Sequence, residues 1–144
     1  MNKYLFFIFM LMTGCERACH GDPFEWVQNG DIKCLKFFLE GGGDPNLISD
    51  EKGTLLIYAM NNKSLRPHEV LEVLLDFGAD PNRACKGFDP PLVSAARWAD
   101  EVSVKMLLDK GADKNILGVD GRSAMDNVGE GGAATARIRH MLKK

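Results

Sequence analysis

The sequence predicts an all-α repeat solenoid, built from helix-turn-helix pairs that are joined by β-hairpin fingers. Three short motifs that share an Asp-x-Asn core carry this prediction, at residues 43–46, 78–82 and 111–115. Their asparagines are 36 and 33 residues apart, and each motif follows an apolar run with helical spacing. A repeat of this length is typical of proteins in which each unit buries its apolar face against the next one.

The motifs also resemble a known family. Leu71-Glu72-Val73-Leu74-Leu75 and Val104-Lys105-Met106-Leu107-Leu108 each precede a Gly-Ala-Asp motif, and Thr54-Leu55-Leu56-Ile57-Tyr58-Ala59 opens a unit. These segments resemble the ankyrin-repeat patterns "VVxLLLxxGADxN" and "TPLHxA". The resemblance covers residues 22–144 and implies an ankyrin domain of four repeats, at 22–46, 47–82, 83–115 and 116–144.

The residue types that recur in this pattern suit their positions for physical reasons. The motif glycine allows the left-handed backbone that ends a helix, and the Asp and Asn that follow hydrogen-bond local backbone at the start of the finger. Thr54 and Ser123 are positioned to cap the next helix, and Pro91 suits a first helical turn. We expect Ala59, Ala95 and Ala96 to let neighbouring first helices approach closely.

The N-terminus has the features of an export signal. Lys3 precedes an unbroken apolar run at residues 4–12, which is too short to span a bilayer as a helix. Met12-Thr13-Gly14-Cys15 resembles the bacterial lipobox, so we expect a lipoprotein signal peptide at 1–14, lipidation of Cys15 and a tether at 15–21. A plain cleaved signal and an uncleaved apolar anchor are the alternatives. Glu16, which is not the Asp typical of inner-membrane retention, favours the outer membrane with the domain facing the periplasm.

The remaining cysteines fit an oxidising compartment only loosely, since three is an odd number. Cys34 falls on a core-facing helical position and is expected to pack there. Cys19 and Cys85 are expected either to be free or to pair with each other.

Little in the sequence indicates chemistry. A formal net charge of −2, without a basic stripe, gives no reason to expect nucleic acid. His20 lies in the tether, His68 in the inter-helix loop of the second repeat and His140 in the last helix. None has a nucleophile or a carboxylate at a useful spacing. The cysteine spacings match no zinc pattern. We therefore expect no enzymatic activity, no catalytic residues, no metal and no cofactor.

The resemblance implies that a partner protein binds the finger tips and the exposed face of the first helices. Trp98 stands out, because tryptophan often contributes much of the energy of an interface; packing against the inter-helix turn is its alternative role. Phe88 either contacts the partner or braces its finger. The residues mapped to this surface are Glu51, Lys52, Tyr58, Asn61, Asn62, Lys86, Phe88, Asp89, Ser94, Arg97, Trp98 and Arg122.

Together these features predict a periplasm-facing lipoprotein that works as a monomeric protein-binding module. The favoured function is an immunity protein, which neutralises a toxic effector enzyme such as a secretion-system phospholipase or a wall hydrolase. The alternative is a structural or stress-related scaffold that supports an envelope enzyme. An effector that acts on host proteins is a third possibility, and the lipobox argues against it.

Overall fold

The computed structural model describes residues 19–61 and 64–144. Within these residues the helices form four consecutive pairs, with one short hairpin after the first pair. The elements are, in chain order, α2 (Pro23–Asn29), α3 (Ile32–Glu40), β1 (Ile48–Ser49), β2 (Gly53–Thr54), α4 (Leu55–Asn61), α5 (Pro67–Asp76), α6 (Pro91–Arg97), α7 (Glu101–Asp109), α8 (Ala124–Asn127) and α9 (Ala133–Lys143).

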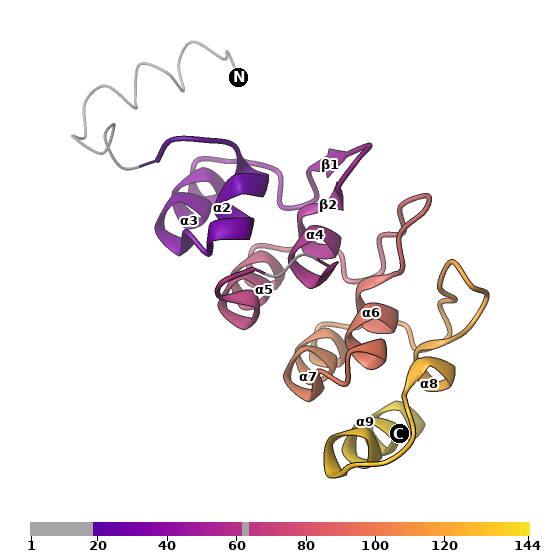
Figure 1. Ribbon diagram of the computed structural model, residues 1–144. Helices are drawn as coiled ribbons and strands as arrows, with labels where there is room; N and C mark the ends of the chain where they lie inside the picture. Colours follow the sequence, from indigo (N-terminus) through magenta and orange to yellow (C-terminus); the bar gives the residue numbers. More distant parts are fainter. Residues whose placement is uncertain (1–18, 62–63) are drawn as a thin grey trace.

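The pairs stack into an elongated solenoid (Figure 1). The first helices of the pairs form one row, in which α2 contacts α4, α4 contacts α6 and α6 contacts α8. The second helices form a parallel row, in which α3 contacts α5, α5 contacts α7 and α7 contacts α9. The connecting fingers project from the side of the first helices (Figure 1). The predicted all-α repeat solenoid is therefore confirmed.

The first finger contains the antiparallel strands β1 and β2, in which Ile48 pairs with Thr54 and Ser49 with Gly53. The next two fingers, at residues 83–90 and 116–122, are built from turns. Gly118 and Arg122 close the last of these with a 2.8 Å bond from the Gly118 amide to the Arg122 carbonyl.

Small side chains allow the first helices to pack closely. Ala59, Ala95 and Ala96 are all essentially inaccessible to solvent, and so are the larger neighbours Leu56 and Leu92. Close packing of such apolar side chains stabilises the fold, because apolar area is removed from water on both sides of each inner repeat.

Helix ends follow the sequence signals. The Thr54 hydroxyl accepts from the Ile57 amide at 3.1 Å, and Ser123 and Asp126 form a capping box at the start of α8. Pro91 occupies the first turn of α6. Gly78 and Gly111 have φ values of 87° and 84°, which is the left-handed backbone expected at the helix ends.

The motif asparagines do more than the local bonding that the sequence predicts. Asp80 bonds its own repeat, by accepting from the Asn82 amide at 2.8 Å. Asn82, in contrast, reaches into the next repeat: its side-chain amide donates to the Gly111 carbonyl at 3.0 Å, and its Oδ1 accepts from the Asp113 amide at 2.7 Å. Asn46 makes the equivalent two bonds to Gly78 and Asp80. These asparagines therefore link each repeat to the following one.

We expect Asn82→Ala to lower the free energy of unfolding by about 1–3 kcal/mol, since it removes two hydrogen bonds of about 0.5–1.5 kcal/mol each. Urea denaturation followed by circular dichroism measures this. Asn115→Ala is the matched control, because the Asn115 side-chain amide bonds only Asp113 of its own motif among the bonds described. Equal losses in the two variants would show that the link between repeats contributes nothing.

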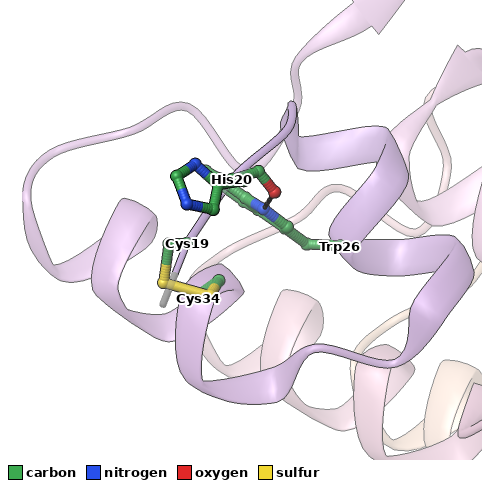
Figure 2. The surroundings of a disulfide bond; sticks show 4 residues. All are labelled: Cys19, His20, Trp26 and Cys34. Carbon is green, nitrogen blue, oxygen red and sulfur yellow. Dashed lines mark hydrogen bonds between the residues drawn. A yellow bond between two sulfur atoms is a disulfide. The ribbon is translucent and has the colours of Figure 1, made fainter. Parts of the chain in front are cut away.

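The cysteine pairing differs from the prediction. Cys34 bonds Cys19 in a disulfide with a Cα–Cα distance of 5.4 Å (Figure 2). Cys85 is a free thiol. Cys34 is buried as expected, but it is not simply a packing residue, and the expected alternatives for Cys19, free or paired with Cys85, are wrong. The reason is that residues 19–22, directly before α2, place Cys19 beside Cys34 of α3 (Figure 2).

The same segment covers the N-terminal end of the stack. The Trp26 indole donates to the His20 carbonyl at 2.9 Å (Figure 2). Its ring lies 6.1 Å from the ring of Phe38. Asp22 caps α2 by accepting from two backbone amides, at 2.8 and 3.0 Å. These contacts hold residues 19–22 against the first helix pair.

The helix α9 closes the other end. Its own Ile138 and Leu142 are buried, and its Arg137 pairs with Glu101 on α7 at 2.6 Å. Arg139 donates to the carbonyls of Val128 and Gly129. The basic side chains of this helix that face the protein are therefore used in packing contacts. No helix in the described part of the chain has the length and apolar character needed to cross a membrane.

Candidate partner-binding surface

The row of first helices carries polar side chains that bond from one repeat to the next. The Tyr58 hydroxyl donates to Gln28 at 3.1 Å. The Ser94 hydroxyl donates to Asn61 at 3.1 Å. These two hydroxyl groups are therefore satisfied by side chains of adjacent repeats.

Two residues that the sequence analysis placed on the surface are buried. Tyr58 is 8% exposed and Ser94 is 2% exposed. Each lies on an inner first helix with a neighbour on both sides, and its polar end faces the side chain of an adjacent repeat. The side chain of Tyr58 also packs edge-on against Phe24, with ring centroids 5.4 Å apart. The structure therefore corrects the expectation that Tyr58 and Ser94 are available to a partner.

Arg97 joins three elements. Its guanidinium pairs with Asp89 at 2.9 Å and with Asp120 at 3.1 Å, and its Nε donates to Asn127 at 3.2 Å. Asp89 also accepts from the Val119 amide at 2.9 Å. The fingers at residues 83–90 and 116–122 and the row of first helices are thus held together by one charged network. Asp89 and Arg97, both mapped to the binding surface, make these contacts within the chain.

Among the other finger residues, Glu51, Lys86 and Arg122 are exposed. Lys52 is half-buried, and its ammonium lies 5.2 Å from the centroid of Phe24 and 5.3 Å from that of Tyr58. Both distances are typical of cation–π contacts. Phe88 is half-buried too, and its Cδ2 lies 3.5 Å from where a Cβ on Gly53 would be. Phe88 therefore braces the finger before it.

Trp98 is the most exposed of the aromatic candidates, at 71%. It ends α6, and the chain turns sharply after it because Ala99 adopts a left-handed φ of 54°. This turn is closed by bonds from the Ala99 and Asp100 amides to the carbonyls of Ala96 and Ala95. The indole is consequently presented to solvent at the inter-helix turn. Two other candidates, Asn62 and the lipidation residue Cys15, lie outside the described residues.

The structure brings together a polar cluster that the sequence analysis missed. His68 Nε2 lies 3.0 Å from both carboxylate oxygens of Asp100, although the sequence suggested no carboxylate near any histidine. The Ser103 hydroxyl donates to Asp100 at 2.6 Å. The spacing of 32 residues between His68 and Asp100 is close to the repeat length, so stacking places them side by side.

This cluster is not a catalytic triad. A nucleophilic serine needs a base within hydrogen-bond reach, whereas here Asp100 lies between Ser103 and His68 and receives both bonds. Asp100 also caps α7 by accepting from the Ser103 amide at 3.1 Å. Its role is therefore to hold the start of α7 against α5. In the described part of the chain, no group of three or more His, Cys, Asp or Glu side chains is placed to hold a metal ion.

Hydrogen bonding shifts the titration of this carboxyl group. Burial raises the pKa of Asp100, but the bonds from Ser103 and His68 and the charge of His68 outweigh it, so the pKa lies below its usual value. Because the pKa is lower in the folded state than in the unfolded state, the ionised Asp100 carboxylate stabilises the fold at neutral pH. This contribution to the free energy of unfolding is lost as the pH falls through the range below about 4.

Acidification from pH 6 to pH 3 should lower the free energy of unfolding of the Asp100→Asn variant less than that of the parent protein. Asparagine keeps the cap of α7 but has no charge to titrate. Urea denaturation at the two pH values measures the difference. Ser103→Ala, which removes the hydroxyl donor, should flatten the same profile; identical acid sensitivity in all three proteins would contradict the assignment.

Comparison with known proteins agrees with this architecture. Residues 24–117 match the family model described as Ankyrin repeats (3 copies). The chain is 27% identical to Ankyrin repeat and SOCS box protein 11 of Danio rerio over 119 residues. This alignment covers 83% of this chain and 38% of that protein. It is 29% identical to Inactive serine/threonine-protein kinase TEX14 of Bos taurus over 99 residues. That alignment covers 69% of this chain and 6% of the bovine protein. The chain therefore spans well under half the length of these two relatives.

Proposed function

From the premise that this chain belongs to the ankyrin-repeat family, whose members are generally protein-binding modules without catalytic activity, we propose that it is an exported immunity protein. In this function it binds and neutralises a toxic effector enzyme, such as a secretion-system phospholipase or a wall hydrolase. It acts from the periplasmic side of the outer membrane, to which a lipid on Cys15 anchors it.

The proposed location is supported mainly by the Cys19–Cys34 disulfide. Disulfides persist in oxidising compartments such as the bacterial periplasm, and they are rare in the cytosol. The N-terminal segment supports the same location, since a basic start, an apolar run at residues 4–12 and the lipobox-like Met12-Thr13-Gly14-Cys15 precede the disulfide.

The form of the domain supports inhibition by binding. Its helices form a continuous stack with bonds between successive repeats, and it presents the exposed indole of Trp98. A preorganised surface binds with a smaller entropic cost than a flexible one, which favours tight, selective binding. A scaffold for an envelope enzyme, the alternative function, would share the location but needs no inhibition.

Lipidation is tested by growing bacteria that express the full chain with an alkyne analogue of palmitate. We expect the parent protein to incorporate the label and to fractionate with the outer membrane. Cys15→Ser should lose the label, whereas Cys85→Ser, the control, should keep it. A parent protein that stays unlabelled would exclude the lipid anchor.

Inhibition is tested by capturing partners of the oxidised full-length protein from the envelope and secreted fractions of its native organism. We expect one dominant hydrolase, whose activity on phospholipid or peptidoglycan falls to zero at an equimolar amount of this protein. A hydrolase that binds and remains active, or a set of weakly bound envelope proteins, would refute inhibition and support the scaffold.

A further inference from the structure

The last two fingers, at residues 83–90 and 116–122, are joined into one surface. They project from the same side of the row of first helices (Figure 1). The Asp89 carboxylate of one finger accepts from the Val119 amide of the other at 2.9 Å, and Arg97 pairs with a carboxylate on each. The two fingers therefore present their side chains together.

The tip of the last finger is apolar and has a fixed backbone. Leu117 is 56% exposed and Val119 is 61% exposed. The Gly121 amide donates to the Gly118 carbonyl at 3.0 Å, and the Gly118 amide is bonded as described above. Because these bonds hold the loop in one conformation, a partner that packs on the two apolar side chains need not first order them.

Three cations lie on the same surface. Lys86 is exposed on the first of the two fingers, and Arg83 directly follows Asn82 at the base of that finger. Lys114 directly follows Asp113, whose amide donates to the Asn82 side chain at 2.7 Å. This bond between repeats brings the bases of the two fingers together, and with them Arg83 and Lys114.

The positive charge of these side chains is not balanced within the surface. The ion pairs found among residues 19–61 and 64–144 involve none of Arg83, Lys86 and Lys114. The carboxylates of Asp89 and Asp120, which lie on the same fingers, are already paired with Arg97. An acidic ligand is therefore favoured over a basic one.

The first finger has the opposite character, since it carries the exposed acidic residues Asp50 and Glu51. The fingers all project from the same side of the solenoid (Figure 1), so a flat anionic surface, such as a membrane, would meet these carboxylates as well as the cations. A protein segment can be acidic only where it meets the last two fingers. The change of charge along the row, together with the apolar tip, therefore favours a protein as the ligand.

We propose that the last two fingers bind an acidic segment of the partner protein. Its aspartate or glutamate side chains pair with the three cations, while a neighbouring apolar side chain packs against Leu117 and Val119. The inference rests on the proposed binding function and adds the chemistry of the partner. It also gives the bound segment a direction, because the acidic part lies away from the first finger.

The test uses a random peptide library displayed on phage, selected against the oxidised full-length protein. We expect the enriched peptides to carry aspartate or glutamate beside an apolar residue. Synthetic versions are then measured by fluorescence anisotropy. Binding to Lys86→Glu should be about tenfold weaker than to the parent, because like charges then face each other, and it should weaken for the parent as salt is added. Leu117→Ala should bind about fivefold more weakly, because it removes apolar contact area.

Two variants serve as matched controls. Lys36→Glu makes the same change of charge on the exposed side of α3 in the first repeat. Val102→Ala shortens an exposed apolar side chain, 46% accessible, on α7. Both should bind the peptides as the parent does, and all four variants should keep its circular dichroism spectrum because the replaced side chains are exposed.

Several outcomes would overturn the proposal: no enrichment, enrichment of basic peptides, or peptide affinity that is unchanged in Lys86→Glu and Leu117→Ala. Lys86→Glu is also compared with the parent for binding to phosphatidylglycerol vesicles and for a molecular mass that rises with concentration. An effect of Lys86→Glu there, without one on the peptides, would assign the cations to a membrane or to a second copy of this chain. In each case a hydrolase captured and inhibited as described above would still establish the immunity function, so the two failures are distinguishable.

Discussion

Loss of the Cys19–Cys34 disulfide is expected to lower the free energy of unfolding by about 3 kcal/mol. The bond closes a loop of 15 residues, and cross-linking such a loop removes about this much conformational freedom from the unfolded chain. For a domain of this size the loss corresponds to a fall of roughly 10 °C in the melting temperature.

Cys19→Ser tests this with little disturbance of the core, because Cys19 is half-buried whereas Cys34 is buried. Thermal unfolding is followed by circular dichroism with and without dithiothreitol. The parent protein and the Cys85→Ser control should both be destabilised by the reductant, and Cys19→Ser should be insensitive to it. A parent protein that melts at the same temperature in both conditions would mean that the bond does not stabilise the fold.

Leu74→Ala is expected to lower the free energy of unfolding by about 2–5 kcal/mol, which is the usual range when a buried leucine is replaced by alanine. Leu74 is fully buried, and its helix α5 contacts α3, α4 and α7. The cavity thus opens where three helices meet and where the surroundings have little freedom to close it.

Leu142→Ala provides the comparison, because Leu142 is also a buried leucine but belongs to the terminal helix α9, which contacts α7 and α8. We expect a smaller loss there, since a helix at the end of the stack can shift to fill the gap. Urea denaturation of both variants measures the difference. A larger loss for Leu142→Ala would indicate that the terminal repeat, and not the middle of the stack, limits stability.

Local patterns predicted the fold well because each one acts within a few residues. The left-handed Gly78 and Gly111, the cap at Thr54 and the buried alanines all follow from steric and hydrogen-bonding rules that a single repeat already contains. The period then places each repeat beside the next one, so the solenoid can be predicted without knowledge of any individual long-range contact.

The candidate site was harder to predict, because it depends on what side chains do across repeats. Tyr58 and Ser94 occupy positions that vary in the family pattern, yet their hydroxyls bond Gln28 and Asn61 of adjacent repeats. His68 and Asp100 meet for the same reason, and their spacing of 32 residues was a usable signal. The disulfide was beyond the pattern altogether, since Cys19 lies in a segment that precedes the first repeat.

The disulfide also makes the two ends of the solenoid differ in their resistance to local unfolding. The first repeat is cross-linked to the segment before it, whereas the last repeat relies on the four-residue helix α8 and on the packing of α9. In native-state hydrogen exchange, the amides of α8 and α9 should therefore open first and those of α4 to α6 last. Under reducing conditions α2 and α3 should lose their protection as well, and the molecule would then open from both ends.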